Sequence, residues 1–159
     1  MALGVFMAAG KSTVGPLVAA RLDLPFVDLD EAVASSAHRS LAALFLEEGE
    51  EGFRAREATA VKQICLGPPA VVALGGGTLH HGDNLARLRA RFEIVVLHVE
   101  WPVIAGRLNA DEERPLAGRG RSLYQARLAG YRAAGSWIDA THLSPEEAAE
   151  AVIAALESR

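Results

Sequence analysis

The chain contains few cysteines, few aromatic residues and no long hydrophobic run, and each scarcity excludes a class of protein. A single cysteine, Cys65, excludes an intrachain disulfide and a metal site built from cysteines. No stretch approaches the ~20 consecutive apolar residues that cross a membrane. The five histidines show no metal-ligand spacing. Aromatic residues make up only 6% of the chain, which leaves no platform for stacking nucleic-acid bases.

The charge balance also narrows the range of partners. The formal net charge is −4 at pH 7, so a general nucleic-acid-binding surface is not expected. The N-terminus shows no charged segment followed by an apolar one, as a secretory signal would have. We therefore expect a cytoplasmic protein without a membrane or nucleic-acid partner. A length of 159 residues, with 50% of them hydrophobic, predicts one domain with its own core.

Short apolar runs alternate with longer helical patterns along the chain. Continuous runs such as 70–74 are typical of strands buried on both faces. The alternation predicts an α/β fold with a doubly wound parallel sheet, in which ligands bind beyond the carboxyl ends of the strands. The expected strands are 2–6, 24–28, 70–74, 94–99 and 137–140. The expected helices are 11–22, 41–47, 50–65, 84–91, 101–109, 123–134 and 144–157.

The tetrapeptide Gly10-Lys11-Ser12-Thr13 lies between the first expected strand and the first expected helix. This context is typical of a phosphate-binding P-loop, because the N–H groups at a helix N-terminus attract phosphate. Lys11 would approach the β- and γ-phosphates of a nucleoside triphosphate, and Ser12 would bind Mg²⁺. An ordinary helix start is the alternative interpretation.

The loop departs from the full P-loop motif at two positions. Val5 stands at the first glycine position, and Ala8 stands at a second place where small-molecule kinases often carry glycine. Glycine suits such loops because it adopts backbone angles that a Cβ disfavours. The two substitutions therefore put the affinity for the nucleotide and the rate of transfer in question.

Two carboxylates follow the second expected strand. Alternate residues of an extended segment point to the same side, so Asp28 and Asp30 would share a side near the phosphates. One carboxylate could hold Mg²⁺ directly or through water, and the other could bind a substrate hydroxyl and accept its proton. The alternative is a pair of exposed acids at the start of a helix.

Two further motifs suit an anionic substrate. On a helix, Arg54 and Glu57 face one another, and a guanidinium held by a carboxylate suits bidentate capture of a substrate carboxylate. A surface helix with ordinary salt bridges is the alternative. The glycines at 75–77 follow a buried strand and would let a ligand approach the backbone closely, with a flexible turn as the alternative.

A polar segment at 110–121 contains one proline and two glycines. Such a segment predicts a mobile lid, and a lid arginine would stabilise the transferring phosphoryl group and exclude water. A plain solvated loop is the alternative. On the helix that follows, Arg127 and Arg132 could line the same cleft.

Taken together, these motifs resemble the shikimate kinase family. The resemblance runs from Gly4 to the C-terminal helix. The matching pieces are, in order, Phe6-Met7, 10–15, 26–30, Gly49-Glu50, Phe53-Arg54, Glu57, 75–77, Arg114-Pro115-Leu116, Arg127 and Tyr131. The match is specific because all of these pieces occur in this order and at suitable spacings.

The resemblance implies a three-layer α/β/α P-loop kinase fold, with a five-stranded parallel sheet flanked by helices and a mobile lid. The whole chain, 1–159, would be one P-loop kinase domain, with the lid at about 110–121 and a substrate-binding segment at about 30–57. The resemblance further implies transfer of the γ-phosphoryl group of ATP, with Mg²⁺, to the 3-hydroxyl of shikimate in aromatic amino-acid biosynthesis. It also implies a monomer.

The same resemblance assigns roles to individual residues. The catalytic residues would be Lys11, Asp30 and Arg114. The nucleotide would be held by Ala8, Ala9, Gly10, Lys11, Ser12, Thr13, Arg107 and Arg114, with Arg107 against the adenine. The Mg²⁺ ligands would be Ser12 and Asp28, the latter acting through water. Shikimate would contact Asp30, Arg54, Gly75, Gly76, Gly77 and Arg127, and the two arginines would grip its carboxylate.

The chain also departs from the family, and two alternative functions stay open. Ala129-Gly130 stand where the family usually has Pro-Leu before Tyr131. One alternative is a related small-molecule kinase of the gluconate type, although Arg54, the glycine run and Arg127 argue against it. The other is a shikimate-binding protein with impaired use of ATP, which the altered glycine positions motivate.

Overall fold

The computed structural model describes residues 1–6, 8–109 and 120–158. The strands are β1 (Ala2–Val5), β2 (Phe26–Asp28), β3 (Val71–Ala73), β4 (Ile94–His98) and β5 (Ser136–Asp139). The helices are α1 (Lys11–Leu22), α2 (Leu29–Ala37), α3 (Leu41–Leu66), the 3₁₀ turn η1 (Thr78–His80), α4 (Asn84–Arg91), α5 (Trp101–Asn109), α6 (Gly120–Ala134) and α7 (Pro145–Glu157). Most of the expected lid, including Arg114, lies outside the described residues.

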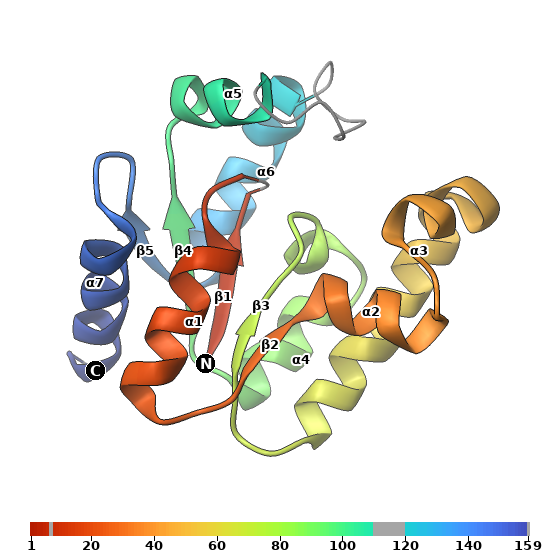
Figure 1. The fold of residues 1–159 in the computed structure, drawn as a ribbon, viewed down its shortest axis with the longest axis horizontal. Helices are drawn as coiled ribbons and strands as arrows, with labels where there is room; N and C mark the ends of the chain where they lie inside the picture. Colours follow the sequence, from red (N-terminus) through yellow and green to blue (C-terminus); the bar gives the residue numbers. More distant parts are fainter. Residues whose placement is uncertain (7, 110–119, 159) are drawn as a thin grey trace.

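The strands form one parallel sheet in the order β2-β3-β1-β4-β5. Connections between parallel strands are right-handed, so the direction of each crossover decides which face its helix covers. The crossover from β1 to β2 runs opposite to those from β3 to β4 and from β4 to β5. Helix α1, with α7 packed against it, therefore covers one face, and α4 and α6 cover the other (Figure 1). The predicted three-layer fold is confirmed.

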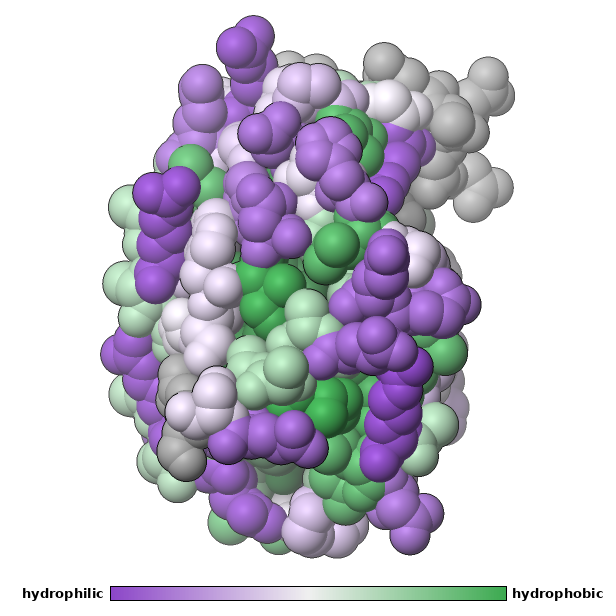
Figure 2. All heavy atoms as spheres, turned by 90° about the vertical axis from the view of Figure 1, so that its left-hand side faces the viewer, coloured by the Kyte–Doolittle hydropathy of each residue, from purple (hydrophilic) through white to green (hydrophobic). Residues whose placement is uncertain are grey.

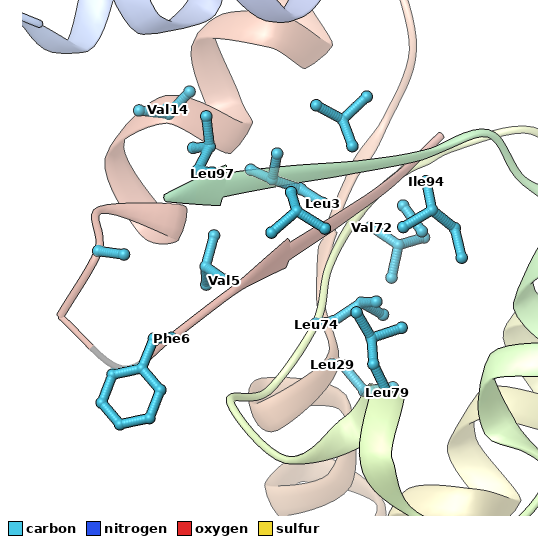
Figure 3. Close-up of a cluster of buried hydrophobic side chains, with 14 of the residues drawn as sticks. Leu3, Val5, Phe6, Val14, Leu29, Val72, Leu74, Leu79, Ile94 and Leu97 are labelled. Carbon is cyan, nitrogen blue, oxygen red and sulfur yellow. The ribbon is translucent and has the colours of Figure 1, made fainter. Parts of the chain in front are cut away.

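The core lies on both faces of the central strands. Leu3 of β1, Val72 of β3 and Leu97 of β4 are buried, as continuously apolar strands in a parallel sheet should be. Side chains from these strands meet Val14 of α1 and Leu79 of η1 (Figure 3). Each fully buried aliphatic side chain of this kind contributes about 1.5–3 kcal/mol. This packing holds rigid the strands that carry the site residues.

The sequence prediction missed one helix and divided another. No helix was expected over α2, in which Leu29 and Val33 are the only large apolar side chains and the others are mostly small. It forms because the Asp28 side chain accepts a hydrogen bond from Asp30 N at 2.9 Å and caps the helix. The helices expected at 41–47 and 50–65 are joined as α3, with a kink where Gly49 has φ 69° and ψ −174°.

The face of the molecule that includes α7 mixes hydrophilic residues with smaller hydrophobic areas (Figure 2). Helix α7 begins with a capping box, in which Ser144 accepts a hydrogen bond from Glu147 N and the Glu147 carboxylate accepts one from Ser144 N. Among the helices of the described residues, none is long and apolar enough to cross a membrane. Cys65, near the end of α3, is partly exposed.

Two glycines make a matched test of how closely the connection from α6 to β5 packs against β4. A Cβ at Gly135 would lie 2.1 Å from the carbonyl oxygen of Ile94, whereas a Cβ at Gly106 in α5 would meet nothing within 4 Å. Gly135→Ala should therefore lower the free energy of unfolding by about 1–3 kcal/mol. Gly106→Ala should raise it by about 0.5–1 kcal/mol, because alanine favours a helix. Urea denaturation of both variants measures the difference, and equal stabilities would contradict the packing at β5.

Candidate active site

The connections around β1 create a crevice at the carboxyl edge of the sheet. Strand β1 leads to α1 on one face, whereas its neighbours β3 and β4 lead to helices on the other, and ligands bind at switch points of this kind. A cleft of about 260 Å³ opens here. It is lined by Lys11, Ser12, Asp28, Asp30, Glu31, Ala34 and Leu41. The structure thus brings together the lysine, the serine and both aspartates that the sequence singled out.

The phosphate-loop candidate between β1 and α1 places only one of the two altered residues under backbone strain. Gly10 has φ 98° and ψ 18°, a left-handed conformation that glycine adopts freely. Ala8 has φ 60°, which costs a residue with a Cβ about 1–2 kcal/mol. Val5 instead lies in β1 opposite Leu97, buried and without a positive φ. Backbone strain from a Cβ at a glycine position of the motif is therefore present at Ala8 and not at Val5, whose β-branched side chain suits a strand. The effect of the two residues on nucleotide affinity and transfer rate stays a prediction.

The Lys11 ammonium bridges the two aspartates. Its Nζ donates to Asp30 Oδ2 at 2.6 Å and to Asp28 Oδ1 at 3.1 Å. Asp28 is 8% exposed, so its carboxylate depends on these partners to offset its desolvation. Asp28 and Asp30 share a side as predicted, but the reason is the cap of α2 and the lysine rather than an extended segment.

The oxygens beside this lysine fit a magnesium ion. Ser12 Oγ lies 3.5 Å from Asp28 Oδ2, while Asp28 Oδ1 is occupied by Lys11 and by Asp30 N. Mg²⁺ prefers oxygen ligands and usually takes one or two from the protein, with water and substrate phosphates supplying the others. In the described part of the chain no group of three or more acids, histidines or cysteines could hold a metal by itself. A site completed by phosphate oxygens is the arrangement that these residues suit.

Arg54 in α3 is held by a fully buried carboxylate. Its guanidinium donates to Glu57 Oε2 at 2.8 Å, and Glu57 is 0% exposed. The second oxygen, Oε1, accepts from the Thr78 hydroxyl at 2.6 Å. Two polar partners therefore compensate the buried charge of Glu57 and keep Arg54 in one orientation. The sequence pattern identified the Arg54–Glu57 pair but gave no sign of Thr78.

The glycine run after β3 is required by neighbouring side chains. A Cβ at Gly75 would lie 2.7 Å from Asp30 Oδ1 and 3.0 Å from Glu57 Oε1. A Cβ at Gly77 would lie 2.3 Å from an Arg54 guanidinium nitrogen. Neither glycine has a positive φ. The glycines therefore let Asp30 and Arg54 approach the same short stretch of backbone, rather than providing a flexible turn.

Arg127 reaches this stretch from α6. Its guanidinium donates to the carbonyl oxygen of Gly76 at 2.9 Å. The Tyr131 hydroxyl lies between the carbonyl oxygens of Gly76 and Val5. Burial raises the pKa of Tyr131 well above its ordinary value, so the hydroxyl keeps its proton and remains a donor. Arg54 and Arg127 thus approach the glycine run from two different helices.

The remaining predicted residues lie partly at the edge of the site. Arg107 in α5 donates to the carbonyl oxygen of Ala8 at 2.9 Å and so touches the loop. Ala9 is buried just before Gly10, and Thr13 is exposed in the first turn of α1. Arg132 does not join Arg127, because its guanidinium lies over the Trp137 ring, 5.1 Å from the centroid. The expectation that Arg132 could line the cleft was wrong, since it leaves α6 on the side facing β5.

A protein-family model for shikimate kinase matches residues 7–157. A shikimate kinase from Salinibacter ruber is 47% identical over 111 residues, which are 69% of this chain and 53% of that protein. One from Thermodesulfovibrio yellowstonii is 36% identical over 93% of this chain and 89% of its own length. The chain thus spans about half the length of the first of these curated relatives and most of the second.

Among solved structures, a shikimate kinase from Acinetobacter baumannii in complex with shikimate superposes with a TM-score of 0.93 at 27% identity. The match covers 99% of this chain and 92% of that one. The likeness therefore extends over all the layers of the fold. A gluconokinase from Sinorhizobium meliloti superposes with a lower TM-score of 0.60 at 18% identity, a likeness that concerns the fold alone.

The two positions at which the P-loop motif lacks glycine, Val5 in β1 and Ala8 in the loop, should respond in opposite ways to glycine. Ala8→Gly should raise the free energy of unfolding by about 0.5–1 kcal/mol, because relief of the left-handed strain exceeds the added flexibility of the unfolded chain. Val5→Gly should lower it by about 3 kcal/mol, because it empties a buried strand position. Thermal and urea unfolding test both variants. A destabilised Ala8→Gly variant would contradict the loop conformation described above.

Proposed function

The chain belongs to the shikimate kinase family, and from that premise we propose that it transfers the γ-phosphoryl group of ATP to the 3-hydroxyl of shikimate. The observation that carries the proposal is the convergence of three cations on one edge of the sheet. Lys11 comes from the phosphate loop, and Arg54 and Arg127 reach the glycine run. A triphosphate and a carboxylate are the anions that such a set would bind.

The nucleotide would bind at the start of α1. The backbone N–H groups of 10–13 and the positive end of the helix would face the phosphates. Lys11, which forms ion pairs with Asp28 and Asp30 in this structure, would turn to the β- and γ-phosphates. Ala8 and Ala9 would line the loop, with Arg107 beside the base. Arg114 would approach from the lid.

Mg²⁺ would be held by Ser12 directly and by Asp28 through water. When bound, the ion would neutralise phosphate charge and so ease transfer. Asp28 is suited to this role because its Oδ2 faces Ser12 while its other oxygen caps α2. Its carboxylate is therefore held in place before any ligand arrives.

The acceptor would lie between Asp30 and the two arginines. Asp30 would take the proton from the 3-hydroxyl as that oxygen bonds to the γ-phosphorus and the bond to the β-phosphate oxygen breaks, releasing ADP. Arg54 and Arg127 would bind the shikimate carboxylate, with backbone contacts from Gly75, Gly76 and Gly77. Release of Asp30 by Lys11 would free its carboxylate to accept from the hydroxyl when the nucleotide is in place.

We further propose the organisation that the family resemblance implies. The chain would act as one domain over 1–159, with a lid at about 110–121 and a substrate-binding segment at about 30–57. It would work as a cytoplasmic monomer on small molecules, without nucleic-acid or membrane partners. Its net charge of −4 supports the absence of a nucleic-acid partner.

A second candidate is a protein that binds shikimate but uses ATP poorly. The strained Ala8, at φ 60°, is the observation that favours it. Activity assays of Ala8→Gly separate the two candidates. A large gain in turnover would support an impaired loop, whereas unchanged turnover would show that the loop tolerates alanine.

Release of ADP from MgATP, measured with and without shikimate, tests the transfer. Lys11→Ala should lower shikimate-dependent release by at least about 100-fold, because a preorganised charge at the phosphates is lost. Lys62→Ala, an exposed lysine on α3, is the control and should keep wild-type activity. Equal activity in Lys11→Ala and wild-type protein would contradict the role of the loop. Absence of both turnover and shikimate binding in the wild-type protein would overturn the proposed function.

The two arginines should affect the acceptor more than the nucleotide. Arg54→Lys and Arg127→Lys should each raise the KM for shikimate by about 10–100-fold, because a lysine loses the paired hydrogen bonds to a carboxylate. The KM for ATP should change little. Arg132→Lys, on the same helix but over Trp137, is the matched control. Steady-state kinetics with both substrates varied measures the effect, and an unchanged KM for shikimate would contradict the assignment.

A further inference from the structure

The 3₁₀ turn η1 follows the glycine run and contacts groups that hold the two arginines, Arg54 and Arg127. At one end, Thr78 donates to Glu57, the carboxylate that holds Arg54. At the other end, His80 Nε2 lies 3.1 Å from the carbonyl oxygen of Arg127. This turn therefore connects the two helices, α3 and α6, from which the arginines project.

His80 fits against α6 because Gly130 has no side chain. A Cβ at Gly130 would lie 2.5 Å from His80 Nε2 and 2.9 Å from its Cδ2. Glycine inside a helix costs about 1 kcal/mol relative to alanine, so a glycine here needs a compensating contact. The imidazole supplies it by occupying the notch that Gly130 leaves. The same contact explains why a larger residue is absent at this position.

The imidazole also contacts Tyr131, the residue after Gly130. Its ring stands edge-on to the Tyr131 ring, with centroids 4.7 Å apart and an angle of 81° between the planes. The contacts at 127, 130 and 131 share one face of α6, since residues three and four apart are neighbours on a helix. On that face Arg127 and Tyr131 both reach the Gly76 carbonyl. His80 thus packs against the face of α6 that contacts the glycine run, beside the hydrogen bond from Arg127 to Gly76.

The hydrogen bond defines the form of the histidine. A carbonyl oxygen only accepts, so Nε2 carries the proton and donates it to Arg127 O. The His80 side chain is exposed on one side, and its partial burial against α6 lowers its pKa. The nearby guanidiniums of Arg127 and Arg54 lower this pKa further, against the opposing effect of the hydrogen bond. The neutral imidazole therefore supports α6 without adding charge beside a carboxylate site.

We propose that His80 is a positioning residue for binding of the acceptor carboxylate. It fixes the place of Arg127 by filling the space beside Gly130 and by donating a hydrogen bond to the Arg127 carbonyl oxygen. The proposal rests on the proposed function of Arg127 as a carboxylate ligand. His80 does not itself have to touch the substrate. Thr78, at the other end of η1, has the corresponding role for Arg54, because it donates to the Glu57 carboxylate that holds this arginine.

Substrate kinetics test the positioning role. His80→Ala should raise the KM for shikimate about fivefold, as expected for one net hydrogen bond, with kcat and the KM for ATP little changed. His80→Gln, which keeps an N–H donor, should recover most of this loss, whereas His80→Leu should not. His81→Ala is the matched control, because His81 is exposed like His80 but its side chain makes no hydrogen bond to the described residues.

A double-mutant cycle in urea unfolding tests the contact without using activity. Gly130→Ala should destabilise the wild-type protein, where the new methyl group meets the imidazole, but should stabilise the His80→Ala variant, where only helix propensity is left. Additive effects of the two substitutions would overturn the contact. Coupling without any change in the KM for shikimate would overturn the positioning role. A wild-type protein without shikimate-dependent turnover would defeat the proposed function instead, and the unfolding cycle would still decide whether His80 fixes α6.

Discussion

The parallel direction of the strands is the constraint on which the site depends. Every strand of this sheet ends at the same edge, and the loops that follow β1, β2 and β3 must therefore meet there. The order of the strands sends the chain from β1 to one face and from β3 and β4 to the other, which opens the crevice. Burial of the central strands on both faces holds these ends at fixed positions.

Charge pairing determines how the side chains at that edge are held. Lys11 is neutralised by Asp28 and Asp30, and Arg54 by Glu57. Buried or partly buried charges need such partners because desolvation is costly. The same ion pairs hold Lys11 and Arg54 in place before an anionic ligand binds. A phosphate that approaches Lys11 competes with an aspartate, so binding of one substrate would release the group that acts on the other.

Glycine has three different uses along this edge. Gly10 allows a left-handed turn before α1, and Gly75 and Gly77 leave room for an aspartate and an arginine. Gly130 leaves room for an imidazole. Only the first of these uses concerns backbone freedom; the others concern the space that a Cβ would fill. Ala8 shows the reverse case, in which a small side chain is carried at a positive φ.

Much of the fold and of the site followed from local spacing. The alternation of apolar runs and helical patterns predicts the parallel sheet, and Gly10-Lys11-Ser12-Thr13 predicts the phosphate loop. The aspartates and the glycine run were found because they directly follow strands. Such patterns are visible in a sequence because the physical causes, hydrophobic periodicity and helix capping, act within a few residues.

Other features depended on contacts between residues far apart in the chain. Whether Val5 or Ala8 was the strained position depended on where β1 ends, which pairing with β4 decides. The partners Thr78 and His80 lie 21 and 47 residues from the groups they hold, Glu57 and Arg127. The sequence by itself determined which residue types stand at the ends of the strands. Only the tertiary structure decided which of them touch, because segments far apart in the chain must pack before these contacts exist.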